Sequence, residues 1–514
     1  MLLSALQKVV QRQPSNISLA YGDRELSYQE LYSNISAFAK GLQSVGVGKG
    51  VGVALLLPNC PEFVISFYAV AGLNAILLPL NHLFKPEEIA YYLSDSNIKV
   101  IITDQVRAEL CAPLIEHLPA PITVISINAE LPVGHYFGDL LTSQVAVPSQ
   151  QLPVLVDADS DFLYQYSSGS TGRPKRVGRT QRNLHHELSS FAQTAQITSQ
   201  DKILCLVPMY HAHGLGNCLL AATCNGAKLV ILEQLLDKRG CAREVPFVFR
   251  GLQVLELIAQ ESITILPAVP YILGALAETP VDFKADLSTL RLCFSAGNFL
   301  SRETFDAFWR RFQIPVRQLY GCTEAGAIAI NLEENPEPTW NSVGQILKNV
   351  TVQILDESGL AVLLGDIGEV VIASGALTSG YHNRPELNQQ AFKDGLFYTG
   401  DLGKLDDQGN LYITGRKKIL IDTGGRKVDP IEVEDVLLNH CQVKEAVVVG
   451  AKDGTAGELV KAVIVPQDAE NCDSQAITTY CQSQLAEFKV PKIIEFREEI
   501  PKSPLGKILR KSLV

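Results

Sequence analysis

The sequence predicts an α/β protein: a large N-terminal domain of helix-covered β-sheets plus a small barrel-like sheet, followed by a small α+β domain. Three observations predict this organisation. The chain has 514 residues, which is enough for two or more domains with large cores. Short apolar runs alternate with helical stretches up to about residue 345. Closely spaced strands and Gly- and Asp-rich turns come next, and the last stretch mixes helices with strands.

The N-terminal part shows the alternation that is typical of parallel sheets covered by helices. The expected strands are Val51–Leu57, Val100–Thr103, Ile122–Ile127, Lys228–Leu232, Ile263–Leu266, Leu290–Phe294 and Val316–Leu319. An apolar stretch over residues 63–80 raises the question of a membrane span. Gly72, Asn74 and Pro79 interrupt it, and Pro61-Glu62 suits a first helical turn. We therefore expect a buried helix, then a strand over residues 75–78, and no membrane span.

The chain after residue 345 is expected to form the barrel-like sheet and then the α+β domain. The sheet strands are Val350–Leu355, Gly368–Ala373 and Asn410–Thr414. The α+β domain holds the helix Asp429–Asn439, the strands Ala446–Gly450 and Glu458–Val465, and the helix Ser474–Ala486. We place the domain boundary after Arg416, with an N-terminal domain over residues 1–416 and a C-terminal domain over residues 417–514.

Composition narrows the class of partner. The formal charge is −11, from 44 basic and 55 acidic residues, which argues against nucleic acid or an anionic membrane surface. Basic residues still gather in two stretches, Arg173 to Arg182 and Arg416 to Lys427. Such clusters suit a small polyanion such as ATP or CoA, although a solvated basic face would look the same. The 11 cysteines include no C-x-x-C pair, which argues against disulfides or zinc. No signal peptide is evident at the N-terminus, so we expect a cytoplasmic enzyme.

One loop has the residues of a phosphate cradle: Tyr166-Ser167-Ser168-Gly169-Ser170-Thr171-Gly172-Arg173-Pro174-Lys175. The two glycines let the backbone approach a ligand closely, and the hydroxyls and N–H groups can donate to phosphate oxygens. It is not a Walker A loop, because Arg173 follows the second glycine. A Ser/Gly linker is the alternative. The apolar strand over residues 162–166 and the lysine at the end favour the cradle.

Four further motifs follow in order: Tyr320-Gly321-Cys322-Thr323-Glu324, Tyr398-Thr399-Gly400-Asp401, Gly415-Arg416 with Gly424-Gly425, and Pro504-Leu505-Gly506-Lys507. With the loop, this set resembles the adenylate-forming superfamily of acyl-CoA synthetases, aryl-CoA ligases, firefly luciferase and nonribosomal adenylation domains. The resemblance runs from about residue 15 to the C-terminus. It implies ATP-dependent activation of a small carboxylic acid to acyl-AMP with release of pyrophosphate, then transfer to a phosphopantetheine thiol.

The resemblance also implies roles for the motif residues. The loop would close over the β- and γ-phosphates of ATP, Thr323 would contact the α-phosphate and Glu324 would hold Mg²⁺. The structural alternative for Glu324 is an ordinary surface carboxylate. Asp401 would accept hydrogen bonds from the ribose hydroxyls, with Arg416 nearby. The implied cofactor-binding residues are Ser167, Ser168, Gly169, Ser170, Thr171, Gly172, Lys175, Gly297, Tyr320, Gly321, Asp401, Arg416, Lys418, Gly424 and Gly425.

Lys507 is the leading catalytic candidate beside Thr323 and His211. Two anions meet when a carboxylate attacks the α-phosphate, and an ammonium between them neutralises charge that is concentrated in the transition state. An exposed tail lysine is the alternative. The resemblance implies a mobile C-terminal domain that turns about a hinge at Lys418 and brings Gly424-Gly425 to the pantetheine tunnel for thioester formation.

Three residues depart from the family pattern: Arg176 stands in place of glycine, Ile419 in place of an acidic residue, and Asp422 in place of lysine. The first would add a phosphate or CoA contact. The other two bear on the thioester conformation and on the choice of thiol.

The acyl motif Pro208-Met209-Tyr210-His211-Ala212-His213-Gly214 resembles that of acyl- and aryl-CoA ligases, with His211 beside the carboxylate or gating the tunnel. Ala212 stands where amino-acid-activating domains have aspartate, which disfavours an α-amino acid because a methyl group cannot pair a buried ammonium. A carboxylate supplied from elsewhere in the chain is the alternative. His213 is expected to pack or to support a neighbouring site residue; a metal ligand is the alternative, but no partner ligands lie at useful spacing. We expect the acceptor to be CoA. The alternative is a stand-alone adenylation enzyme that loads an acyl, aryl or amino acid onto an acyl or peptidyl carrier protein. A luciferase-type oxygenase and a non-enzymatic nucleotide sensor are remoter alternatives.

Overall fold

The structure is a computed structural model that describes the whole chain except residues 85, 116, 119–120, 143–156, 168–174, 237–241, 244, 246, 417–420, 424–425, 429, 454–456, 469–470, 486 and 504–507. The chain forms two compact units. The first comprises Met1–Thr351 and Ile372–Phe397, and the second comprises Val352–Val371 and Tyr398–Val514. The second unit therefore includes residues that precede position 417, and the boundary after residue 416 stays a prediction.

One sheet of the first unit has seven strands in the order β7-β6-β5-β3-β4-β8-β9. The strands are β3 (Gly52–Leu56), β4 (Ile76–Pro79), β5 (Ile98–Thr103), β6 (Thr123–Ser126), β7 (His135–Tyr136), β8 (Asp161–Ser167) and β9 (Lys175–Thr180). All pairs are parallel except β8 with β9. The expected buried helix is α3 (Pro61–Gly72), and the expected strand after it is β4. In the described part of the chain, no helix is long and apolar enough to cross a membrane.

A second sheet has nine strands in the order β18-β17-β16-β15-β14-β10-β11-β1-β2. The strands are β1 (Ile17–Tyr21), β2 (Arg24–Ser27), β10 (Lys202–Cys205), β11 (Lys228–Ile231), β14 (Ile265–Ala268), β15 (Leu292–Ser295), β16 (Val316–Cys322), β17 (Gly326–Ile330) and β18 (Gln345–Ile346). The central strands from β16 to β1 pair in parallel, and antiparallel pairs close both edges. The parallel strands β11, β14, β15 and β16 lie at or near the apolar runs that predicted them, while β1 and β10 were not expected.

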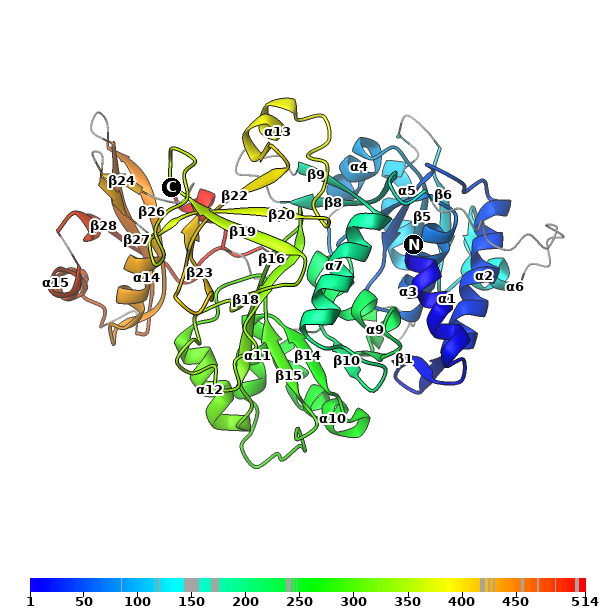
Figure 1. Cartoon of the computed structure of the whole chain (residues 1–514), viewed down its shortest axis with the longest axis horizontal. Helices are drawn as coiled ribbons and strands as arrows, with labels where there is room; N and C mark the ends of the chain where they lie inside the picture. Colours follow the sequence, from blue (N-terminus) through cyan, green and yellow to red (C-terminus); the bar gives the residue numbers. More distant parts are fainter. Residues whose placement is uncertain are drawn as a thin grey trace. The chain divides into compact units, whose positions relative to one another are not determined.

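Helices cover both sheets, as expected. One large apolar core lies between the two sheets and their helices, and a separate apolar cluster packs α4 and α5 against β3, β4 and β5. Phe67 of α3, Phe191 of α7 and Phe294 of β15 all belong to the large core. Helices α10, α11 and α12 lie beside β14 and β15 (Figure 1). The helices of the first unit are α1 (Leu2–Arg12), α2 (Tyr28–Ser44), α3, α4 (Pro86–Asp95), α5 (Gln105–Ile115), α6 (Phe137–Thr142), α7 (Gln181–Thr194), α8 (Ala212–Gly214), a π-helix (Leu215–Leu220), α9 (Ala221–Thr223), α10 (Gly251–Glu261), α11 (Pro270–Ala277), α12 (Arg302–Phe312) and α13 (Pro385–Ala391).

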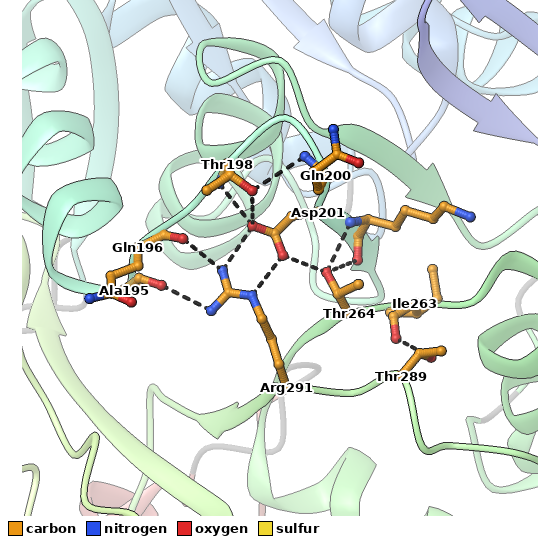
Figure 2. A network of polar contacts seen from close by, with 10 residues as sticks. Ala195, Gln196, Thr198, Gln200, Asp201, Ile263, Thr264, Thr289 and Arg291 are labelled. Atoms are coloured by element: carbon orange, nitrogen blue, oxygen red, sulfur yellow. Dashed lines mark hydrogen bonds and ion pairs between the residues drawn. The ribbon is translucent and has the colours of Figure 1, made fainter.

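A polar network fixes the beginnings of β10, β14 and β15 (Figure 2). Arg291 donates from Nε to Oδ1 of Asp201 at 2.7 Å and from Nη2 to Oδ2 at 2.8 Å. The Thr264 hydroxyl donates to the same carboxylate at 2.8 Å, and the Thr198 N–H does so at 2.8 Å. Arg291 also donates to the carbonyl of Ala195 at 3.1 Å. The network lies at the amino ends of these strands, so their carboxyl ends, where ligands bind in open α/β sheets, stay available.

A five-stranded sheet has the order β19-β20-β22-β21, with β23 paired to β22. The strands are β19 (Val350–Leu355), β20 (Gly368–Ser374), β21 (Phe392–Lys393), β22 (Leu396–Leu405) and β23 (Leu411–Arg416). This is the barrel-like sheet that the sequence predicted, and β19, β20 and β23 match the expected strands closely. The division between the two units runs through β19, β20 and β22.

The C-terminal part of the second unit is α+β, as expected. Its three-stranded sheet has the order β26-β27-β28. It has its own apolar core, which includes Val433, Val448 and Ile477. The elements are β24 (Ile421–Thr423), β25 (Arg426–Val428), α14 (Pro430–Leu438), β26 (Val443–Asp453), β27 (Gly457–Pro466), α15 (Ser474–Gln484), β28 (Ile493–Phe496) and a terminal 3₁₀-helix (Arg510–Leu513). The pair β24–β25 and the strand β28 were not expected.

Candidate active site

The motif with Glu324 forms the tip of the β16–β17 hairpin. Tyr320 and Gly321 lie near the end of strand β16, and Thr323 and Glu324 lie in the connection between β16 and β17. A Cβ at Gly321 would lie 2.5 Å from the carbonyl oxygen of Gly326, so only glycine permits this close pairing. The Glu324 side chain is buried, at 8% exposure. The alternative of an ordinary surface carboxylate is therefore wrong.

Glu324 is held by a segment that precedes α13. Oε1 of Glu324 accepts a hydrogen bond from the hydroxyl of Tyr381 at 2.8 Å. Its backbone oxygen accepts from the N–H of Thr378 at 2.9 Å. A carboxylate that is buried and oriented in this way is suited to a hard divalent cation, which prefers oxygen ligands.

The phosphate-cradle loop connects the antiparallel strands β8 and β9. Ser167 and Lys175 face each other across these strands, so both ends of the loop are fixed by the ladder. The loop positions between them, Ser168, Gly169, Ser170, Thr171 and Gly172, lie outside the described residues. The Nζ of Lys175 lies 4.5 Å from the ring centroid of Tyr381. The loop lysine and the Glu324 carboxylate therefore contact the same tyrosine.

The segment with Thr378 and Tyr381 also binds the strand that follows the loop. The Thr378 hydroxyl donates to the carbonyl of Gly178 at 2.5 Å, and the N–H of His382 donates to the carbonyl of Arg176 at 3.0 Å. The segment thus joins β9 to the β16–β17 hairpin. It brings together two motifs that are far apart in the sequence.

The arginines of β9 and its neighbourhood have partners within the protein. Arg176 donates to the backbone carbonyl of Asp95 and stacks 4.8 Å from the ring centroid of Tyr164. Arg179 is 1% exposed and pairs with Glu187, with Nη1 to Oε2 at 2.7 Å. The expectation that this basic stretch serves a polyanion is wrong for Arg179, because its guanidinium is buried and neutralised. The phosphate or CoA contact of Arg176 stays a prediction.

The acyl motif follows β10. His211 is exposed, caps the short helix α8, and accepts at Nδ1 from the N–H of His213 at 3.4 Å. His213 is buried, and its Nε2 lies 3.1 Å from the carbonyl oxygen of Ala268, so Nε2 carries the proton. Its Nδ1 then accepts from the amide of Asn217 at 2.9 Å. Burial lowers the pKa of His213 to about 4, so the ring is neutral at pH 7. His213 is a packing residue, as expected.

Gly297 lies just beyond the carboxyl end of β15. Its φ is +82°, a conformation that side chains rarely adopt, while a Cβ there would meet no atom within 4 Å. The backbone conformation therefore favours glycine at this position, although a larger side chain would have room.

The described residues contain no group of three His, Cys, Asp or Glu side chains that could hold a metal ion.

Asp401 and Arg416 lie in the second unit, directly opposite each other on β22 and β23. Arg416 donates from Nε to Oδ1 of Asp401 at 2.6 Å. Asp401 is 3% exposed, and its N–H donates to the Thr399 hydroxyl at 3.0 Å. The N–H of Gly400 donates to Oε1 of Glu369 at 3.0 Å. The two sequence-predicted residues thus form one pair on an ordered strand ladder.

Several predicted residues lie outside the described part of the chain: Lys418, Ile419, Gly424, Gly425 and Lys507. Asp422 belongs to β24. In the first unit the structure brings together Lys175 and Glu324 through Tyr381, which sequence reasoning missed. A signal was present: the segment from Ser374 to Tyr381 is rich in Ser, Thr and Gly, and such segments often bind phosphate or backbone groups.

Comparison with known proteins defines the class. The model of the AMP-binding enzyme family matches residues 6–382, and that of the AMP-binding enzyme C-terminal domain matches residues 432–507. The chain therefore belongs to the AMP-binding enzymes, which are the adenylate-forming superfamily that the motifs indicated.

Individual relatives agree with this assignment. The chain is similar to a long-chain-fatty-acid–CoA ligase of Mycobacterium tuberculosis, with 33% identity over 95% of this chain and 92% of the relative. It is similar to a 4-coumarate–CoA ligase of Solanum tuberosum, with 32% identity over 96% of this chain and 89% of the relative. It is also similar to the structure of o-succinylbenzoate–CoA synthetase from Bacillus subtilis in complex with ATP and magnesium ion. That match has a TM-score of 0.83 and 26% identity, and covers 99% of this chain and 98% of the other. The protein is an adenylate-forming acid–thiol ligase that uses ATP.

Proposed function

We propose that this protein is a carboxylic acid–CoA ligase. It joins an acid to AMP with release of pyrophosphate and then transfers the acyl group to the thiol of CoA. The observation that carries the proposal is the likeness, over nearly the whole chain, to two CoA ligases named for very different acids. Because their acids differ and their acceptor is the same, the likeness favours CoA and leaves the acid open.

In the first half-reaction a carboxylate oxygen bonds to the α-phosphorus, and the bond from that phosphorus to the bridging oxygen of pyrophosphate breaks. Negative charge accumulates as the two anions meet. We propose that Lys507 neutralises it and that Thr323 donates to the α-phosphate. Glu324 fits Mg²⁺ because its carboxylate is buried and oriented, and the bound cation would neutralise phosphate charge. Asp401 would accept from the ribose hydroxyls, with Arg416 fixing its carboxylate.

In the second half-reaction the CoA sulfur bonds to the acyl carbon and the bond to AMP breaks, so AMP leaves. We propose that residues 417–514 turn about Lys418 between the two steps, which would withdraw Lys507 and bring Gly424-Gly425 to the pantetheine arm. His211, exposed at the start of α8, would lie beside the carboxylate of the acid.

The acid is proposed to be an aliphatic or aryl acid without an α-amine. Ala212 offers no charge to an ammonium, and the neighbouring His213 is neutral because burial lowers its pKa to about 4. A buried ammonium without a carboxylate partner would be strongly disfavoured. The residues of the acyl motif therefore favour uncharged acyl chains and rings.

ATP–pyrophosphate exchange over a panel of fatty, aryl and amino acids tests the first half-reaction. The best acid is then offered with CoA and, in parallel, with an acyl or peptidyl carrier protein that carries the phosphopantetheine arm. We expect exchange with a fatty or aryl acid, and a thioester with CoA. A thioester with the carrier protein alone would replace CoA as the acceptor, and oxygen-dependent light would indicate a luciferase. Absence of exchange with every acid would contradict the proposal.

A further inference from the structure

Tyr381 contacts both Lys175 and Glu324, the two residues of the first unit for which roles in binding phosphate and Mg²⁺ are proposed. Its hydroxyl donates to Oε1 of Glu324 at 2.8 Å, and an ionised carboxylate can only accept, so the direction of the bond is fixed. The ammonium of Lys175 lies over the face of the ring, 4.5 Å from its centroid. The face of an aromatic ring attracts a cation, while the hydroxyl at its edge binds the anion. The Tyr381 side chain therefore contacts the Lys175 ammonium through its ring face and the Glu324 carboxylate through its hydroxyl.

Tyr381 is itself held firmly. It is 5% exposed, and its ring packs edge-on against Phe392 with centroids 5.5 Å apart. Its N–H donates to Oδ1 of Asn388 at 2.7 Å, and its carbonyl accepts from Nδ2 of the same residue at 2.8 Å. Val177 of β9 pairs with Tyr381 in an isolated antiparallel bridge. Asn388 and Val177 thus hold the backbone of Tyr381, and Phe392 packs against its ring.

We propose that Tyr381 is a positioning residue that orients the Glu324 carboxylate for Mg²⁺ and holds the Lys175 ammonium at the start of β9. The inference rests on the proposed role of Glu324 in binding Mg²⁺. Residues that hydrogen-bond to a metal ligand fix its orientation, and their loss typically weakens metal binding by about 10- to 100-fold. If the ring were only packing against Phe392, the hydroxyl would have no part in metal binding.

The test is Tyr381→Phe, which removes the hydroxyl and keeps the ring with its contacts to Phe392 and Lys175. The Mg²⁺ concentration for half-maximal pyrophosphate exchange should rise about tenfold, the lower end of such losses. Saturating Mg²⁺ should restore most of the rate. The dissociation constant of Mn²⁺, measured by electron paramagnetic resonance with a non-hydrolysable ATP analogue, should rise by the same factor. Tyr381→Leu also removes the ring face and should in addition raise KM for ATP.

Tyr412→Phe is the matched control. Tyr412 donates its hydroxyl to Oδ2 of Asp406 at 3.2 Å, and Lys404 lies 5.8 Å from its ring centroid. The control therefore removes the same kind of tyrosine–carboxylate hydrogen bond, also beside a lysine that lies over the ring. This bond lies on strand β23 of the barrel-like sheet. It should leave the Mg²⁺ requirement and the Mn²⁺ affinity unchanged.

Glu324→Gln, measured alongside, separates the inference from the proposal beneath it. If Glu324→Gln weakens Mn²⁺ binding and Tyr381→Phe does not, the role of Tyr381 is wrong and the metal role of Glu324 stands. If Glu324→Gln changes neither measurement, both are wrong. The combined variant should bind Mn²⁺ no more weakly than Glu324→Gln alone, because the hydroxyl acts through that carboxylate.

Discussion

Arg179 and Glu187 form an ion pair in the interior of the first unit. Nη1 of Arg179 lies 2.7 Å from Oε2 of Glu187, and the side chains are 1% and 4% exposed. The carboxylate also packs against the backbone at two glycines. A Cβ would lie 2.5 Å from Oε1 of Glu187 at Gly216, and 2.1 Å from its Cδ at Gly326. The pair therefore lies against the hairpin that carries Glu324, and its loss should affect both stability and the site.

Glu187→Leu should lower the free energy of unfolding by about 3–5 kcal/mol, because it leaves the Arg179 guanidinium buried without a carboxylate. Adding Arg179→Met should recover most of this loss, since apolar side chains can replace a buried ion pair. Urea unfolding followed by tryptophan fluorescence measures the effect in the first unit, where both tryptophans lie, at 309 and 340. A double variant no more stable than Glu187→Leu would show that the pair is not what the single change disrupts.

The carboxylate of Asp201 makes stability depend on acid pH. Burial alone would raise its pKa, but hydrogen bonds from Arg291, the Thr198 N–H and Thr264 outweigh it, so the pKa lies below the usual value. The folded state then binds this proton less tightly than the unfolded state, in which the pKa is about 3.9. The stabilisation is therefore complete above that pH and is lost as the pH falls through the folded pKa.

Asp201→Asn should cost about 1–3 kcal/mol at pH 7, the price of disrupting hydrogen bonds to a buried charge. The gap between the wild type and this variant should stay constant from pH 7 to about 4 and narrow as the pH falls from about 4 to 3. Urea unfolding across that range measures it. Asp159→Asn is the control, because its pair with Arg182 is exposed, and it should show a much smaller gap. A gap for Asp201 that stays constant down to about pH 3 would contradict the assignment.

Sequence patterns predicted most of the parallel strands and the C-terminal helices because those elements are apolar and regular enough to show locally. The strand β9 (Lys175–Thr180) was missed, since Lys-Arg-Val-Gly-Arg-Thr reads as a basic stretch. Its two arginines can be buried because each pairs with a carboxylate of a helix, Arg176 with Asp95 of α4 and Arg179 with Glu187 of α7. Tyr381 was missed for the same reason, because it lies 57 residues from Glu324 in the chain. The Ser, Thr and Gly residues before Tyr381 mark the segment, but pairing over such distances does not show locally which residue the segment will contact.

Arg416→Ala should weaken ATP binding and moderately lower stability. Arg416 holds the buried Asp401 carboxylate by a 2.6 Å hydrogen bond, so its removal frees the group that is proposed to bind ribose. We expect KM for ATP to rise about tenfold, in line with the loss of an orienting partner. The Asp401 side chain is only 4% exposed, so the loss of its partner should also lower the free energy of unfolding, by about 1–3 kcal/mol.

Arg416→Lys is the comparison for that prediction. Lysine keeps the charge but lacks the planar guanidinium that matches a carboxylate, so it should restore only part of the affinity. Steady-state pyrophosphate exchange at varied ATP gives KM, and thermal unfolding of the same preparations gives stability. If Arg416→Ala left KM for ATP unchanged, Asp401 would not depend on this arginine for its task.

Lys507→Ala should separate the two half-reactions. Adenylation should fall by about 10²- to 10³-fold, the scale of losing one oriented charge at a developing oxyanion. Transfer from chemically supplied acyl-AMP to CoA should continue near the wild-type rate, because that step does not bring two anions together. Lys511→Ala is the control, since Lys511 is an exposed lysine of the terminal 3₁₀-helix, and it should retain both activities. Both rates are measured on one preparation. Equal loss of the two steps would point to damage of the fold, and wild-type exchange would remove Lys507 from catalysis.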